Sequence, residues 1–107
     1  MKTPHDSVRI LGKDWHLVLV KGLKVPGTDD DAYGLTETWE QRISYADGMT
    51  PSQLRDTVFH ELTHAVEETL GLGLEENQVH AIASGLLAVF YDNPWLLPWL
   101  GKMEASK

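Results

Sequence analysis

The sequence contains no cysteine. Disulfide bonds therefore contribute nothing to its stability, and any bound metal must be held by nitrogen and oxygen ligands. No apolar run approaches the roughly 20 residues of a membrane-spanning helix. The first residues also lack the apolar region of a secretory signal. We therefore expect a cytoplasmic protein that does not enter a membrane.

Positive charge is scarce, because nine Lys and Arg stand against 16 Asp and Glu, for a formal net charge of -7. Without a basic cluster, binding to nucleic acid or to an anionic membrane surface is disfavoured. The acidic run at residues 29–31 lacks the ligand spacing of a calcium-binding EF-hand and predicts a solvated turn. The 107 residues, 42% of them hydrophobic, suffice for one domain with a modest core.

The first half of the chain, residues 8–46, predicts two β-hairpins. Residues 8–11 and 16–20 flank the turn-forming cluster Gly12-Lys13-Asp14. Residues 33–36 and 41–45 flank a polar turn. In the last strand Ile43 alternates with polar neighbours, as in a half-buried strand.

The second half predicts two helices. The first covers about residues 50–70: Thr50 can serve as N-cap, Gln53 can close a capping box onto it, and Gly71 is a C-terminal stop. The second covers about residues 75–92, where apolar residues recur at helical spacing. The tail, residues 93–107, begins with a turn and contains an apolar patch.

These elements together predict a single α+β domain spanning residues 1–107. We expect a small, twisted, mostly antiparallel sheet packed on two main helices, with a short C-terminal apolar segment. The apolar patch begins at Trp95 and ends at Leu100. It is expected to close one side of the core, with an oligomer contact or a contact to a larger partner as alternatives.

The first predicted helix carries the motif His-Glu-x-x-His at residues 60–64. His60 and His64 are four residues apart, so both imidazoles project from one helix face and can reach one Zn²⁺ at about 2.0–2.1 Å. Glu61 is rotated toward the open side of the metal, where it can act as general base on a zinc-activated water. The motif predicts a zinc peptidase. The alternative is a solvated helix face that carries two histidines.

A catalytic zinc needs a third protein ligand. The candidates are Glu67, Glu68, Glu75, Glu76 and His80. Glu67 and Glu68 share the helix of the histidines, which gives poor tetrahedral geometry. The turn around Gly71 should fold the second helix back, so that Glu75 or Glu76 approaches the histidines. Glu76 is favoured because it lies at the edge of the apolar arc, where an unpaired carboxylate is costly.

Other side chains are candidates for supporting roles. His80, one turn after Glu76, could orient a ligand carboxylate, stabilise an oxyanion, or simply pack at the seam between the helices. Tyr33, Tyr45 and Tyr91 are further candidates for an oxyanion donor.

The stretch from residue 33 to residue 94 resembles the compact ImmA/IrrE-type zinc peptidases and the minimal metallopeptidase domains of bacterial and phage genomes. These residues carry the resemblance: Tyr33-Gly34, the strand through Ile43, Thr50-Pro51, the motif with Ala65, and Glu76, Val79, Ala83, Gly85 and Leu86 followed by Asp92-Asn93-Pro94. Where larger relatives often have a small acidic or amide residue four positions after the ligand Glu, this chain has His80.

The resemblance implies a gluzincin, with His60, His64 and Glu76 on zinc and Glu61 as base. Its substrate is expected to be a peptide or protein that pairs with an exposed sheet edge, either the strand through Ile43 or the strand at residues 33–36. A non-catalytic, zinc-stabilised interaction module, in which the apolar tail covers the cleft, is the alternative function.

Overall fold

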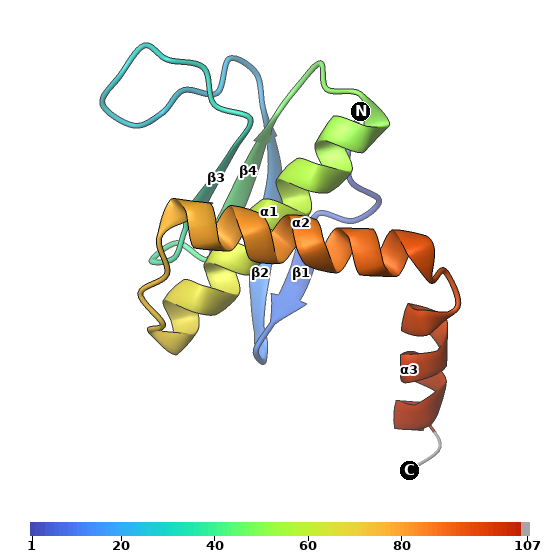
Figure 1. Ribbon diagram of the computed structural model, residues 1–107. Helices are drawn as coiled ribbons and strands as arrows, with labels where there is room; N and C mark the ends of the chain where they lie inside the picture. The colour runs from blue at the N-terminus through green and yellow to red at the C-terminus, as the bar shows by residue number, and fades with distance from the viewer. Residues whose placement is uncertain (106–107) are drawn as a thin grey trace.

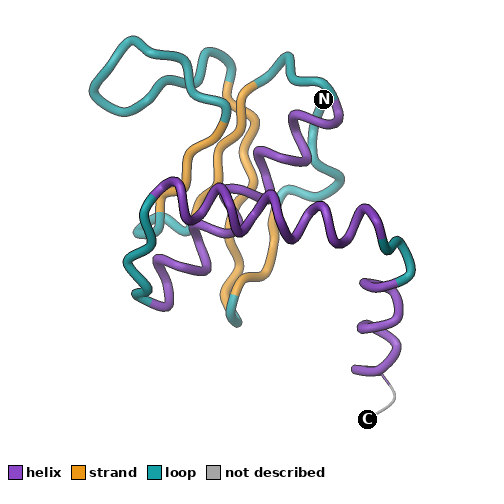
Figure 2. The backbone as a smooth tube through the Cα atoms, in the orientation of Figure 1, coloured by secondary structure: helices purple, strands orange, loops and turns teal. Residues whose placement is uncertain are grey.

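The computed structural model describes residues 1–105, with side chains up to Lys102. A four-stranded sheet forms one layer, two long helices lie on one side of it, and a short third helix extends away from it (Figures 1 and 2). The elements in chain order are β1 (Ser7–Ile10), β2 (Lys13–Val20), β3 (Gly34–Glu37), β4 (Arg42–Ala46), α1 (Pro51–Leu70), α2 (Glu76–Asp92) and α3 (Leu96–Ala105). The α+β prediction is confirmed. None of the helices in the described part of the chain has the length and apolarity needed to cross a membrane.

The sheet is mixed and, as predicted, mostly antiparallel, because two of its three strand pairings are antiparallel. Both predicted hairpins are present: β1 pairs with β2, and β3 pairs with β4, each antiparallel. The hairpins join through a parallel pairing of β2 with β4, in which Leu17 lies opposite Ile43. Turn residues and alternation report only local pairing, so they could not indicate which strand of the second hairpin meets the first. The order β1-β2-β4-β3 leaves β3 at an edge.

Helix α1 packs on the sheet through apolar side chains near both of its ends. Ala65 of α1 packs with Ile10, Trp15 and Ile43 of the strands, and all four are buried. Leu54 packs in a second cluster at the other end of the helix. Neither of the two histidines of α1 belongs to these apolar clusters.

The ends of α1 agree with the predicted signals. The Thr50 hydroxyl accepts a hydrogen bond from Gln53 N at 3.2 Å, and Gln53 Oε1 accepts one from Thr50 N at 3.0 Å. Gly71 ends the helix with φ +68°, a left-handed conformation that glycine adopts without a Cβ penalty. This stop begins the turn that returns the chain toward α1.

The C-terminal apolar patch does not close the core. It forms α3, which extends from the far end of α2 away from the sheet (Figure 1), and its large apolar side chains Trp95, Leu97, Trp99 and Leu100 are exposed. Pro98 lies in the first turn of α3, where a missing N–H costs no helical hydrogen bond. The edge-to-face contact of Trp95 with Trp99, one turn apart, supports the helix.

Candidate metal centre

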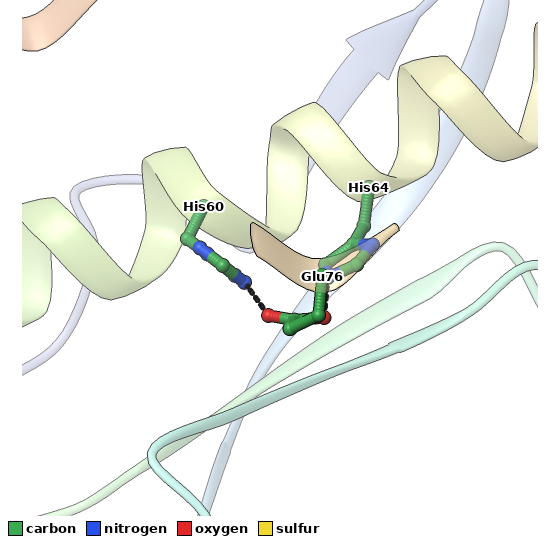
Figure 3. Close-up of side chains that lie close together, drawn as sticks. All are labelled: His60, His64 and Glu76. Carbon is green, nitrogen blue, oxygen red and sulfur yellow. Dashed lines mark hydrogen bonds and ion pairs between the residues drawn. The ribbon is translucent and has the colours of Figure 1, made fainter. Parts of the chain in front are cut away.

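The structure brings His60, His64 and Glu76 together at the start of α2. Glu76 Oε1 lies 2.6 Å from His60 Nε2, and Glu76 Oε2 lies 2.8 Å from His64 Nε2. One carboxylate thus spans both imidazoles (Figure 3). The Glu76 side chain is 70% exposed and the two histidine side chains are largely buried, so the cluster opens to solvent on the Glu76 side.

The turn between α1 and α2 carries Glu76 to this position. Leu72 N donates to Glu67 O at 3.0 Å, and Gly73 adopts φ +65°, so the chain reverses within a few residues. Val79 and Ala83 are then buried between the helices. Phe59 and Phe90 meet edge to face, with ring centroids 6.2 Å apart. Glu76 is the first residue of α2. The packing of the two helices therefore places its backbone close enough for the side chain to reach the histidines.

The donor set fits zinc. Two imidazole nitrogens and a carboxylate oxygen are zinc ligands, and tetrahedral zinc with ligands at about 2.0–2.1 Å holds its donors about 3.3–3.5 Å apart. The ligand atoms of His60, His64 and Glu76 all lie within 4.8 Å of one another. Burial raises the pKa of Glu76, but the charges and hydrogen bonds of His64 and His60 outweigh burial, and the net pKa is lowered. The carboxylate is therefore held in the ionised form that a ligand requires.

Glu61 lies beside this cluster, and its carboxylate faces the sheet rather than the two histidines. It is only 8% exposed, and its Oε1 accepts a hydrogen bond from Thr36 Oγ1 of β3 at 2.9 Å. Burial raises the pKa of Glu61, and the Thr36 hydrogen bond and the two histidines offset part of that rise. A carboxyl group with a raised pKa is better matched to proton transfer near neutral pH than an exposed one.

Gly34 makes the close approach of Glu61 to β3 possible. A Cβ at this position would lie 2.8 Å from both Glu61 Cγ and Thr57 Cγ2. Neither Gly34 nor Thr36 was predicted as a site residue from chemistry. Only the general rule that a glycine within a strand marks a close approach points to Gly34.

A groove runs along β3 in front of the cluster. It consists of two adjoining cavities, of about 230 and 440 Å³, that share Gly34, His60 and Glu61. Glu76 borders the smaller cavity, and Tyr33 and His80 border the larger. The edge strand, the candidate base and a candidate ligand therefore line one continuous surface.

None of the remaining candidates for the third ligand bridges the two histidines, although ligand atoms of Glu67 and Glu68 also lie within 4.8 Å of one another and of a ring nitrogen of His64. Glu75 is the N-cap of α2, and its N–H donates to Gln78 Oε1 at 2.8 Å. Glu68 accepts a hydrogen bond from Thr38 Oγ1. Glu67 is buried on the other side of His64, 3.6 Å from its Nδ1. Of the glutamates, Glu76 is the one whose carboxylate reaches both histidines.

His80 is exposed on α2, with its ring centroid 6.1 Å from that of His60. The prediction that it packs in the helix–helix seam is wrong, because Val79 and Ala83 occupy the seam. The described residues include no hydrogen bond from His80 to Glu76, so the structure does not give it the orienting contact expected from sequence. His80 borders the groove, and its role in stabilising an oxyanion stays a prediction.

The three tyrosines differ in position. Tyr45 is 1% exposed and its hydroxyl accepts from Thr3 N at 3.0 Å, so its prediction as an oxyanion donor is wrong. An inward position on β4 places it in the core. Tyr33 is exposed at the groove. Tyr91 lies under the Arg55 guanidinium, 4.5 Å from ring centroid to Cζ, beside a third cavity of about 410 Å³ that shares Asp56, His60 and His80 with the larger groove cavity.

Comparison of the chain with protein-family models, with curated proteins and with solved structures gives no match. The functional argument therefore depends on the residues of the site and their geometry.

The contact of Gly34 with Glu61 gives a testable prediction. Gly34→Ala should lower the free energy of unfolding by about 1–3 kcal/mol, because the new Cβ overlaps two side chains in a packed site. Gly85→Ala is the matched control: position 85 lies in α2 with open space around its Cβ, so alanine there should raise stability by up to about 1 kcal/mol. Urea unfolding of both variants measures the difference. Equal effects of the two substitutions would contradict the close approach.

Proposed function

We propose that the protein is a zinc-dependent metallopeptidase of gluzincin type, with a minimal zincin-like fold similar to that of the ImmA/IrrE-type peptidases. The observation that carries the proposal is the Glu76 carboxylate between His60 Nε2 and His64 Nε2, with the buried Glu61 beside them. Residues 16 positions apart in sequence supply a zinc donor set of two histidines and one glutamate. None of these three side chains belongs to the two apolar clusters of the described core.

The residues around the cluster have separate tasks. When bound, zinc polarises a carbonyl group and makes water more acidic. His60, His64 and Glu76 hold the ion. Glu61 accepts a proton from the attacking water and then delivers it to the leaving amine, because its raised pKa suits both transfers. Thr36 keeps the Glu61 carboxylate at the wall of the groove.

The substrate is an extended peptide that pairs with β3. This strand is at the edge of the sheet, so one side of its backbone has no neighbouring strand among the described residues. The same strand lines the groove with Glu61, His60 and Glu76. Of the two edges expected from sequence, β3 supports the proposal and the strand through Ile43 does not, because β4 lies between β2 and β3. Addition of a strand would hold the scissile bond close to the cluster.

An open site supports an enzyme over a purely structural zinc module. A structural zinc is usually closed by four protein ligands, and the His60–His64–Glu76 cluster has three members among the side chains that the structure describes. The apolar tail, which was the sequence argument for a covered cleft, lines neither cavity of the groove, and it forms α3, which extends away from the sheet (Figure 1).

Zinc binding tests the ligand set. The wild-type protein should bind one Zn²⁺ per chain, and Glu76→Gln should weaken the affinity by more than about 100-fold, beyond the cost of losing an outer contact. Glu75→Gln is the matched control, because the neighbouring carboxylate lies outside the cluster and its loss should leave affinity nearly unchanged. Competition with a chromophoric chelator measures both. A larger loss of zinc affinity in Glu75→Gln than in Glu76→Gln would contradict Glu76 as the third ligand.

Separation of binding from catalysis tests the role of Glu61. Glu61→Gln should bind zinc like the wild type but cleave an unfolded protein substrate about 10²–10⁴-fold more slowly, because the base is missing. Zinc content and cleavage are measured on the same preparations, with Glu75→Gln as the active control. Zinc binding without cleavage of any peptide library by the wild type would favour a non-catalytic zinc module.

Hydrogen exchange tests where the substrate pairs. A peptide substrate bound to zinc-loaded Glu61→Gln should slow exchange of backbone amides in β3, since a paired strand protects them. Strand β1 is the internal control, because it forms the opposite edge of the same sheet. Protection in β1 instead of β3, or in neither strand, would exclude the proposed mode.

A further inference from the structure

A buried carboxylate lies behind the candidate metal centre and belongs to none of its proposed ligands. Glu67 is 6% exposed on α1. Its Oε1 lies 3.6 Å from His64 Nδ1, and its Oε2 accepts a hydrogen bond from Leu74 N at 3.3 Å. A carboxylate is costly to bury unless it is paired, so these two contacts account for its position.

Each ring nitrogen of His64 faces a different carboxylate. Glu76 Oε2 faces Nε2, and Glu67 Oε1 faces Nδ1. The Nδ1 atom is buried and has no hydrogen-bond partner within the described residues. A neutral histidine that offers the Nε2 lone pair to a metal carries its proton on Nδ1. That buried N–H needs an acceptor, and Glu67 Oε1 is positioned to become one through a shift of a few tenths of an ångström.

The second contact of Glu67 reaches the turn between the helices. Leu74 is two residues before Glu76, and the turn that contains it determines where α2 begins. The backbone of Glu67 also accepts from Leu72 N at 3.0 Å. One residue of α1 thus contacts both a histidine of the cluster and the segment that delivers the glutamate.

We propose that Glu67 is a positioning residue for the metal centre: it holds His64 in the tautomer and orientation that present Nε2, and it fixes the turn that presents Glu76. This role rests on the zinc site proposed above. Glu67 does not itself bind the ion, because it faces the ring edge opposite Glu76. The carboxylate acts through His64, because an acceptor behind a metal-binding histidine fixes the tautomer and orientation of its ring.

Glutamine cannot replace Glu67 in this arrangement. The carboxylate accepts on both oxygens, whereas an amide has one accepting oxygen and one donating NH₂ group. If the amide oxygen faces Leu74 N, the NH₂ group faces His64 Nδ1 and favours the tautomer with its proton on Nε2. If the amide is reversed, the NH₂ group opposes the Leu74 N–H. Either orientation disturbs one of the two contacts.

The test compares Glu67→Gln with Glu68→Gln. Both substitutions remove one negative charge from neighbouring positions of α1, but Glu68 is exposed and bonds to Thr38. Glu67→Gln should weaken zinc binding about 10–100-fold, the usual cost of losing a carboxylate behind a metal-bound histidine. Glu68→Gln should stay within about threefold of the wild type, as expected for an exposed position. Chelator competition gives the affinities, and thermal unfolding of the metal-free proteins shows whether each variant folds.

A spectroscopic readout separates positioning from stability. In ¹⁵N-histidine-labelled, zinc-loaded wild type, His64 should show a slowly exchanging Nδ1 proton and a metal-bound Nε2. The proton signal should persist in Glu68→Gln and be lost or exchange rapidly in Glu67→Gln. The wild-type spectrum tests the proposal even if Glu67→Gln does not fold. A His64 that binds zinc through Nδ1, or that lacks this protected proton, would overturn it.

The outcomes distinguish this role from the proposed function. Unchanged zinc affinity in Glu67→Gln would overturn the role of Glu67 and leave the metallopeptidase proposal intact. Loss of thermal stability in Glu67→Gln with unchanged zinc affinity would make Glu67 a purely structural residue. Failure of the wild type to bind zinc would overturn the proposed function and the role of Glu67 together.

Discussion

The contact of the Glu76 carboxylate with two histidine rings is the constraint on which the proposed metal centre depends. His60 and His64 are held by one rigid helix, so their relative position is set by the α-helix alone. Glu76 comes from another helix, and its position depends on the turn after Gly71 and on the packing of Val79 and Ala83. The site therefore exists only when the two helices are correctly packed. Bound zinc would stabilise the same packing, because a ligand that binds only the folded chain favours folding.

Three glutamates around one histidine pair differ in chemistry because their surroundings differ. Glu76 is exposed and paired with imidazoles, which lowers its pKa and suits a ligand. Glu61 is buried against β3, which raises its pKa and suits a base. Glu67 is buried between His64 and the turn, where it can fix both. Residues of one type thus fit three proposed tasks, and burial and neighbouring groups make the distinction.

Much of the fold was predictable because its signals are local. The capping residue Thr50, the stop at Gly71 and the two hairpin turns determine where elements begin and end, and the structure agrees with them. The convergence of Glu76 on the motif histidines also followed from a tight turn between two helices. The parallel pairing of β2 with β4 was not predictable, because no local pattern reports which strands of two hairpins meet.

The other differences between the sequence predictions and the structure have the same origin. Residues 95–100 were expected to cover the core because they are apolar, but apolar character does not specify a partner, and α3 extends away from the sheet. Helical spacing placed His80 near Glu76 but could not show that Val79 and Ala83 would fill the seam in its place. The contacts of Gly34, Thr36 and Glu67 join separate elements across space. Spacing along the chain carries no information about such contacts.

X-ray absorption at the zinc edge of the metal-loaded protein tests the central claim most directly. The account predicts a four-coordinate ion with nitrogen and oxygen neighbours at about 2.0–2.1 Å, and scattering from two imidazole rings that falls to one ring in His64→Ala. An oxygen-only shell without imidazole scattering, or a spectrum unchanged by that substitution, would contradict a zinc site built on His60, His64 and Glu76.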